Sequence, residues 1–422
     1  IFRKIYVSIL NIKDENIFFY EKCLESSKIN GIETKIFRAY LTYTPTFCNS
    51  CGSINENNSI INWGWDKNCK IILPKVSNYN TILYLDKQRF KCKHCGSTFN
   101  STCSLVDSFK NISNNTQLSI KLDLMNKISE KDIAKRHNVS HNKVNRIMHD
   151  LSNKKVLIGK LPTIMNFDEF KATKDTKGKM AFIITDTNTH KTFDILESRK
   201  SNYLKNYFFK FPRKQRLAVK FIIVDMFAPY YDLFKSIFPN AQIITDRFHV
   251  VAQANNSLKL TRIQIMKQDK KHYKLLKYYW KLIQKDEEQL DSKTKKYSIH
   301  FKKYITDYDI VKYLINTNQT LKGTYEVYQG IIKSIKNKDE KLFINIISST
   351  HKNISEYMKT TLKTYNKFKN FIINSLKYSY SNGVIEGINN LIKTIKRISF
   401  GFRSFYHFKT RILLISGIYK IA

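Results

Sequence analysis

Five short apolar runs lie between residues 161 and 246, and they constrain the fold more than any other feature of the chain. Each is rich in β-branched or aromatic side chains and is bounded by polar or turn residues, which is typical of buried strands. Helix-like segments at 203–211 and 230–238 separate the later runs. Three neighbouring strands followed by strands alternating with helices predict an α/β domain with a mixed sheet. The predicted strands are 161–168, 180–186, 192–196, 219–225 and 241–246.

Acidic side chains close several of these runs. Asp168 closes the first run, Asp225 the fourth and Asp246, followed by His249, the fifth. Far downstream, Glu386 lies in a segment whose isoleucines recur at helical spacing. Carboxylates at adjacent strand ends bind divalent cations, which activate a nucleophile and stabilise the leaving oxygen of a phosphodiester.

We therefore predict that Asp168, Asp225 and Glu386 are catalytic and hold Mg²⁺ or Mn²⁺. An RNase H-like nuclease core has this arrangement, with one acid on its first strand, one at the end of its fourth and one on a later helix. Asp246 and His249 are possible accessory residues that rank below Asp225. Three further acids are expected to be ordinary strand-end residues, namely Glu169, Asp186 and Asp194.

The charge of the chain indicates its partner. Among 422 residues, 73 are Lys or Arg and 34 are Asp or Glu, a formal net charge of +39. AT-biased codon usage explains why the basic residues are mostly Lys, but it would supply acidic residues as well. We therefore predict double-stranded DNA as the partner. No apolar run reaches the ~20 residues of a membrane span, and no signal peptide is visible, so a cytoplasmic protein is expected.

Two CxxC-Gly motifs, Cys48/Cys51 and Cys92/Cys95, stand 41 positions apart. Each pair places two thiolates suitably for one tetrahedral Zn²⁺, and the following Gly permits the tight turn. A redox pair is the weaker alternative. The other cysteines, Cys23, Cys69 and Cys103, are expected to be small apolar residues, with Cys69 as a less favoured extra ligand.

Residues 128–148 have the layout of a helix-turn-helix. Ser129 is expected to cap the first helix, Asn138 to adopt the left-handed conformation of the turn, and Ser140 to cap the second helix. A plain helical hairpin with a polar surface is the alternative. The residues expected to contact DNA are Ser140, His141, Asn142, Lys143, Asn145 and Arg146, together with Asn389, Asn390, Lys393 and Arg397 on the polar face of the Glu386 helix.

The predicted fold class is α+β multidomain. A zinc-binding module and a helix-turn-helix precede an RNase H-like α/β core that a helical insertion interrupts. This insertion binds DNA, contacts another protomer or presents a solvated Lys-rich face. The predicted domains are an N-terminal segment (1–40), a zinc-binding domain (41–105), the helix-turn-helix (106–155), the first part of the core (160–250), the Lys-rich helical insertion (251–375), and the C-terminal core helix with its tail (376–422).

Several motifs resemble those of the ISL3 family of bacterial insertion-sequence transposases. They are Phe167-Asp-Glu-Phe170, Val224-Asp-Met226, Thr245-Asp-Arg-Phe-His249, Asn382-Gly-Val-Ile-Glu-Gly-Ile-Asn-Asn390 and Ile395-Lys-Arg-Ile-Ser-Phe-Gly-Phe-Arg403. The resemblance implies that Asp168, Asp225 and Glu386 form a DDE triad and that the four CxxC cysteines are the zinc ligands. It also implies cleavage at transposon ends and transfer of 3′-OH ends to target DNA, by a homo-oligomer in a synaptic complex associated with the bacterial nucleoid.

Two other functions stay open. A non-catalytic DNA-binding protein, such as a domesticated transposase or a regulator, would share the zinc and helix-turn-helix modules. A resolving nuclease would hydrolyse DNA without joining strands. The intact acid triad favours the transposase.

Overall fold

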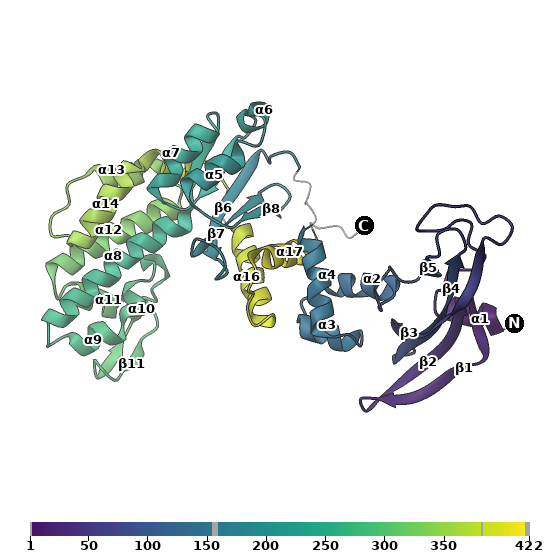
Figure 1. Cartoon of the computed structure of the whole chain (residues 1–422). Helices are drawn as coiled ribbons and strands as arrows, with labels where there is room; N and C mark the ends of the chain where they lie inside the picture. The colour runs from purple at the N-terminus through teal and green to yellow at the C-terminus, as the bar shows by residue number, and fades with distance from the viewer. Residues whose placement is uncertain (1, 154–158, 381–382, 418–422) are drawn as a thin grey trace. The chain divides into compact units, whose positions relative to one another are not determined.

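The computed structural model describes residues 2–153, 159–380 and 383–417, with side chains from residue 5 onward (Figure 1). The chain divides into two compact units. One comprises Ile1–Leu157 with Leu391–Ala422, and the other comprises Ile158–Asn390. Nothing in the described part of the chain is a helix both long and apolar enough to span a bilayer.

The first unit begins with a five-stranded sheet in the order β1-β2-β4-β3, to which β5 adds beside β4. Two hairpins have left-handed residues at their turns, Asn30-Gly31 and Ser77-Asn78, as tight two-residue turns require. Phe37, Leu83 and Ile71 lie on the face that packs into the core. The elements are α1 (Phe2–Ile9), β1 (Ile17–Ile29), β2 (Ile32–Leu41), β3 (Ile60–Val76), β4 (Tyr79–Cys92) and β5 (Thr98–Asn100).

Three helices follow, and a fourth from the far end of the chain joins them. They are α2 (Asn114–Asp123), α3 (Glu130–Arg136), α4 (His141–Asn153) and α17 (Phe405–Ile415). Ser129 caps α3, and Asn138 has a φ of 52° in the turn before α4, which confirms both local expectations. Leu413 and Leu414 of α17 pack into the same core as α2, α3 and α4.

Arg411 fixes α17 to the segment before α3. Its side chain is 1% exposed, and its Nη2 donates to the backbone oxygens of Asn126 and Ile128 at 3.1 and 2.6 Å. Burial lowers the pKa of this guanidinium to about 10. This use of the C-terminal helix as a support for the helical group was not expected from the sequence.

The second unit contains a mixed sheet in the order β10-β9-β6-β7-β8. β6, β9 and β10 run parallel, whereas β7 and β8 form an antiparallel meander on β6. All five predicted strands are present, and their observed bounds are Ile164–Lys171 (β6), Met180–Asp186 (β7), Lys191–Leu196 (β8), Phe221–Val224 (β9) and Gln242–Thr245 (β10).

Aromatic packing covers one face of this sheet. Phe167 on β6 and Phe182 on β7 pack against Phe208 and Phe234, which belong to helices between the strands. These side chains are fully buried, so they hold the strands in fixed register beneath the helices. The helices are α5 (Ser201–Phe208), α6 (Arg213–Leu217) and α7 (Ala228–Ile237).

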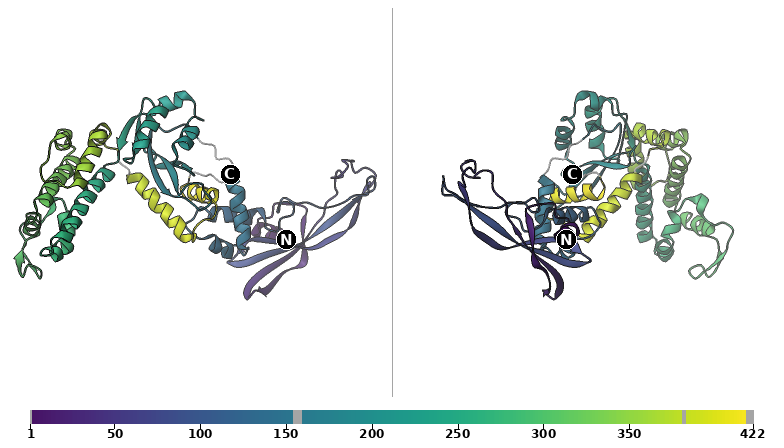
Figure 2. Two further views of the ribbon diagram at one scale, coloured as in Figure 1. Left: turned by 60° about the vertical axis from the view of Figure 1, so that its left-hand side comes forward. Right: turned by 90° about the vertical axis from the view of Figure 1, so that its right-hand side faces the viewer.

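A helical insertion follows β10 and has its own apolar core (Figures 1 and 2). Its elements are α8 (Arg247–Gln268), α9 (Tyr273–Tyr278), α10 (Trp280–Ile283), a 3₁₀ turn (Glu287–Gln289), β11 (Lys296–Ser298), β12 (Lys303–Ile305), α11 (Asp307–Ile315), α12 (Gln319–Lys336), α13 (Glu340–Ser348) and α14 (Glu356–Lys367). The sequence predicted helices throughout, so the β11–β12 hairpin and the break between α9 and α10 correct that expectation.

The chain returns from the insertion beside the point where it leaves the sheet. The hydroxyl of Tyr365 donates to the backbone oxygen of Val250 at 2.6 Å. On α15 (Lys369–Lys377), Asn374 Nδ2 donates to the backbone oxygen of Ile243 in β10 at 2.9 Å. The next helix, α16 (Gly383–Ile398), carries Glu386.

Candidate active site and cysteine cluster

Three carboxylates lie near the carboxyl ends of neighbouring parallel strands. The pairing of β6 with β9 ends at Asn166 and Ile223; Asp168 lies two residues further along β6, and Asp225 directly follows β9. Thr245 pairs with Val224, so Asp246 likewise follows level with Asp225. The carboxyl edge of a parallel sheet is where open α/β folds place ligands.

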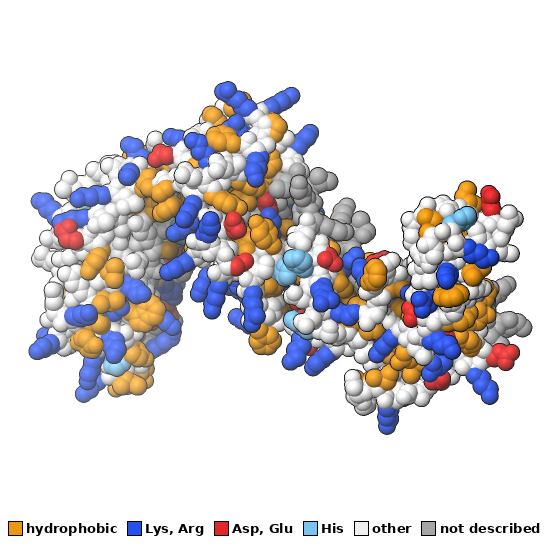
Figure 3. Space-filling model, viewed as in Figure 1, with side chains coloured by type: hydrophobic (Ala, Val, Ile, Leu, Met, Phe, Trp, Pro, Cys, Tyr) orange, Lys and Arg blue, Asp and Glu red, His pale blue; other side chains and the backbone are white. Residues whose placement is uncertain are grey.

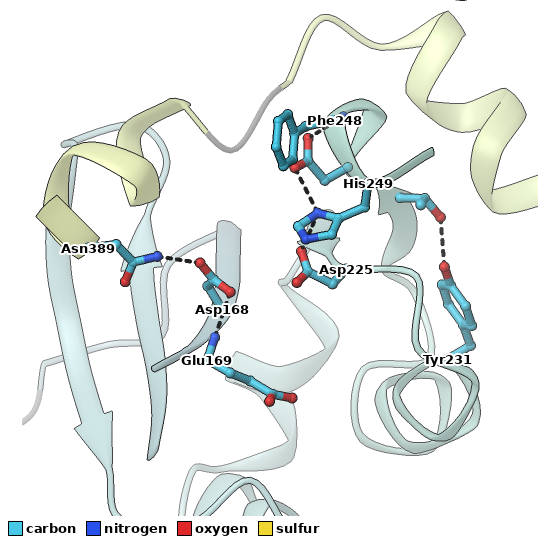
Figure 4. Close-up of polar contacts among 9 residues, drawn as sticks. Asp168, Glu169, Asp225, Tyr231, Phe248, His249 and Asn389 are labelled. Carbon is cyan, nitrogen blue, oxygen red and sulfur yellow. Dashed lines mark hydrogen bonds and ion pairs between the residues drawn. The ribbon is translucent and has the colours of Figure 1, made fainter. Parts of the chain in front are cut away.

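Asp168 is half-buried on β6. Burial, followed by the negative charge of Asp225, raises the pKa of this carboxyl group. The backbone N–H of Glu169 and the side chain of Asn389 oppose the shift by donating to the carboxylate, at 2.6 and 2.5 Å. Figure 4 shows Asn389 of α16 directed at Asp168. The like-charged carboxylates of Asp168 and Asp225 are close enough to interact, and such a pair favours a bound cation.

The side chain of His249 provides a positive charge beside Asp225 and Asp246. Its Nδ1 lies 3.0 Å from Asp225 Oδ1 and 3.2 Å from Asp246 Oδ2 (Figure 4). These two carboxylates raise the pKa of the imidazole to about 10. Ligand atoms of Asp225, Asp246 and His249 all lie within 4.8 Å of one another, an arrangement that could hold a metal ion.

Asp225 and Asp246 differ in accessibility. Asp246 is 6% exposed and caps α8, accepting from the backbone N–H of Phe248 at 3.3 Å. The Asp225 side chain is 29% exposed. Asp225 also lines an open pocket of about 420 Å³ with Glu169, Arg199 and His249, among others.

Glu386 is exposed in the first turn of α16, three residues before Asn389. Residues at this spacing share a helix face, so Glu386 lies one turn from the side chain that contacts Asp168. Within the described residues, the acid and histidine group that converges within 4.8 Å contains neither Asp168 nor Glu386.

The acids expected to be ordinary have local partners. Asp194 is 3% exposed and accepts from the Tyr207 hydroxyl at 2.8 Å. Asp186 accepts from the Asn188 backbone at 2.9 Å within the turn that follows β7. Glu169 pairs with Arg199 at 2.6 Å and also accepts from Tyr230, beside the pocket. Glu169 therefore lines the same pocket as Asp225, although the sequence indicated only an ordinary strand-end acid.

Four cysteines form a second cluster beside the N-terminal sheet, in two turns, one of which begins at the end of β4. The Sγ atoms of Cys48 and Cys95 are 3.7 Å apart, and those of Cys51 and Cys92 are 3.9 Å apart. A tetrahedral Zn–S₄ site with bonds of ~2.3 Å has sulfur separations of about 3.8 Å. Backbone N–H groups of Cys51 and Ser50 lower the pKa of the Cys48 thiol to about 6, which favours the thiolate that binds metal.

Both cysteine turns have the same backbone geometry. Gly52 and Gly96 have φ of 74° and 72°, and each donates to the carbonyl of its first cysteine, Cys48 or Cys92, at 2.9 Å. A residue with a Cβ is strained at such φ values, which accounts for the glycine after each CxxC pair.

The residues expected to contact DNA have mixed exposure. Ser140, His141, Asn142 and Arg146 are exposed at the start of α4. Lys143 is half-buried and donates to Asn111, and burial lowers its pKa. On α16, Asn390, Lys393 and Arg397 are exposed, whereas Asn389 is partly buried against Asp168.

Comparison with known proteins decides the family. A model of the ISL3 family, described as "Transposase", matches residues 165–412, well over half of the chain. The chain belongs to the ISL3 family of DDE transposases. The matched region of this ISL3 transposase runs from β6 into α17, so it contains all the acids described above and the helical insertion. The four cysteines and the α3–α4 pair precede it.

A curated relative gives a shorter match. The ISL3 chain is 39% identical over 121 residues to a Lactococcus lactis subsp. lactis protein named "ATP-dependent protease". The match covers 28% of this chain and 39% of that protein, so the chain spans about two fifths of the relative's length.

Proposed function

We propose that this ISL3-family protein binds the terminal inverted repeats of an insertion sequence, cleaves the ends and joins their 3′-OH groups to target DNA. The observation that carries the proposal is that Asp168 on β6 and Asp225 after the adjacent parallel β9 lie close enough for the charge of Asp225 to raise the pKa of Asp168. Two carboxylates at this edge suit a metal-dependent phosphoryl transfer better than they suit a purely structural role.

The proposed RNase H-like core is supported by the strand order. In chain order the strands lie 3-2-1-4-5 across the sheet, with the second antiparallel and the fourth and fifth parallel to the first. This connectivity brings the first and fourth strands together, which is what a shared metal site at their ends requires.

Asp168, Asp225 and Glu386 are the proposed ligands of Mg²⁺ or Mn²⁺, ions that activate water or a 3′-OH and stabilise the leaving oxygen. Asn389 orients the Asp168 carboxylate by its amide hydrogen bond. His249 neutralises Asp225 and Asp246, and Asp246 and His249 are the proposed accessory pair. Arg199 supplies a cation at the pocket for a DNA phosphate.

DNA recognition is proposed for the α3–α4 pair. The left-handed turn at Asn138 and the exposed His141 and Asn142 at the start of α4 suit a helix-turn-helix that presents α4 to a major groove. Zn²⁺ is the proposed ion at Cys48, Cys51, Cys92 and Cys95, because four thiolates at tetrahedral spacing select it. Assembly as a homo-oligomer on paired DNA ends belongs to the same proposal.

ATP-dependent proteolysis is not proposed for this chain. Neither Gly-Lys pair of the sequence, Gly159-Lys160 or Gly178-Lys179, is followed by the Ser or Thr of a phosphate-binding loop. The given sequence therefore contains no phosphate-binding loop of this kind to match the name of the Lactococcus lactis protein.

One experiment tests the proposed function. The full chain is incubated with duplex DNA that ends in the terminal repeat of its own element, with Mg²⁺, and nicking and strand joining are followed on gels. Glu386→Gln should bind DNA normally but cut at least about a hundredfold more slowly. The control is Glu356→Gln, which alters an exposed acid that forms an ion pair with Lys359.

The outcomes separate the candidates. Binding without any nicking by the wild type would favour a non-catalytic DNA-binding protein. Nicking that survives Glu386→Gln would remove this residue from the triad. Hydrolysis without strand joining would favour a resolving nuclease.

A further inference from the structure

The hairpin β11–β12 lies at the end of the helical insertion remote from the β6–β10 sheet (Figures 1 and 2). One face of the hairpin is anchored. Ile305 belongs to the core of the insertion, and Ser298 Oγ shares a 2.6 Å hydrogen bond with the Tyr279 hydroxyl. In the turn, the ring of Phe301 packs edge-on against Tyr313 at 5.2 Å. The hairpin is therefore held in one position on the helices.

The opposite face presents aromatic rings to solvent. Tyr297 and Tyr304 are paired across the two strands, with ring centroids 5.5 Å apart. Their exposed fractions are 58% and 69%, and Ile299 in the turn is 80% exposed. Large apolar side chains that remain uncovered in a group mark an interaction surface.

The charged side chains along the hairpin are of one sign. Residues 293–304 include five lysines and no acid, and every one of the five is exposed. Asp291, just before this run, uses its carboxylate to accept from the backbone N–H groups of Lys293 and Thr294. Figure 3 shows hydrophobic and basic side chains interspersed at this end of the insertion. The five lysines are Lys293, Lys295, Lys296, Lys302 and Lys303.

We infer that this hairpin binds an unpaired segment of DNA, with its bases stacked on Tyr297 and Tyr304 and its phosphates against the lysines. In a duplex the faces of the bases are stacked on one another and only their edges are accessible, so exposed rings suit unpaired bases better. A protein partner fits poorly, because lysines are depleted at the cores of protein interfaces. The inference goes beyond the proposed strand-transfer reaction and gives the insertion a separate ligand.

Binding of two probes tests the inference. Fluorescence anisotropy of the full chain is measured with a labelled 20-nucleotide oligothymidine and with a 20-base-pair duplex, without added divalent metal. The double variant Tyr297→Ala/Tyr304→Ala should bind the single strand about tenfold more weakly and leave duplex binding within about twofold of wild type. The double Phe variant should retain single-strand binding, because it keeps both rings.

Matched variants distinguish stacking from charge. Lys302→Gln/Lys303→Gln should reduce the slope of log affinity against log salt by about 1.4 for the single strand, whereas the tyrosine variants should leave the slope unchanged. Tyr357→Ala, which removes an exposed tyrosine elsewhere in the insertion, is the control and should have no effect. Circular dichroism and thermal unfolding verify that every variant is folded.

A crosslink locates the contact. Oligothymidine carrying 5-iododeoxyuridine, irradiated with the wild type and analysed by mass spectrometry, should label Tyr297 or Tyr304. Unchanged single-strand affinity in the double Ala variant would overturn the inference. Equal losses for both probes, or labelling confined to other segments, would overturn it as well. These binding assays contain no divalent metal and do not depend on the proposed catalytic residue Asp168. A negative result in them is therefore distinct from an absence of DNA cleavage.

Discussion

Asn389 donates its side-chain amide to Asp168 across 221 residues of sequence, at 2.5 Å. The other amide atom of Asn389, Oδ1, is buried and has no hydrogen-bond partner among the described residues. Asn389 therefore has one clear task in this arrangement, which is to hold the Asp168 carboxylate in place.

Removal of this amide should loosen metal binding. For Asn389→Ala we expect the Mg²⁺ concentration at half-maximal cleavage to rise about tenfold, with unchanged affinity for the terminal repeat. The measurement is a Mg²⁺ titration of the nicking rate, with Asn370→Ala, an exposed position on α15, as the control. Weakened DNA binding with an unchanged Mg²⁺ dependence would instead make Asn389 a DNA contact.

The cysteine cluster should hold one metal ion per chain. Cys51→Ser should reduce bound Zn²⁺ from about one to below about 0.2 per chain and destabilise the N-terminal sheet. Cys69→Ser removes a thiol outside the cluster and should keep the full metal content. Elemental analysis of the purified proteins measures both, and equal zinc in the two variants would contradict the assignment.

Two glycines of α12 should respond differently to the same substitution. A Cβ at Gly323 would lie 2.5 Å from the backbone oxygen of Asn353, whereas at Gly330 it would meet the flexible end of Ile346 at 2.9 Å. Gly323→Ala should therefore lower the free energy of unfolding by about 1–3 kcal/mol, and Gly330→Ala by less. Thermal unfolding compares them, and the reverse order would show that the Asn353 segment yields easily.

Arg411 should stabilise the helical group of the first unit. Arg411→Met keeps much of the side-chain volume but leaves the backbone oxygens of Asn126 and Ile128 without their donor. The free energy of unfolding, measured in urea, should fall by about 1–3 kcal/mol. DNA binding should weaken at the temperature where the variant begins to unfold. Arg403→Met, at an exposed position, is the control and should be neutral.

Local patterns in the sequence predicted much of the secondary structure of the sheet in the second unit. All five strands of its sheet were predicted, because each is a short apolar run bounded by polar residues. The Asn138 turn and the Ser129 cap were predictable for the same reason, since both depend only on neighbouring residues. Asp225 and Asp246 directly follow β9 and β10 as expected, whereas Asp168 was expected to close its strand and instead lies within β6, which continues to Lys171.

Features that depend on distant residues were not predictable. β1 and β3 carry many exposed polar side chains, so these long strands left only short apolar signals in the sequence. Asn389 was interpreted as a DNA contact, although its spacing of three from Glu386 was a signal that it faces the same site. The β11–β12 hairpin was missed because its lysines and tyrosines also suit an exposed helix.

The hydrogen bond from Tyr365 to Val250 bears on how this chain evolved. Because the polypeptide leaves the sheet and returns to it at neighbouring points, more than a hundred residues intervene without separating β10 from α15. A short linker could join the same two points. The insertion could thus have been acquired, enlarged or exchanged as a cassette while the strand register around Asp168 and Asp225 stayed the same.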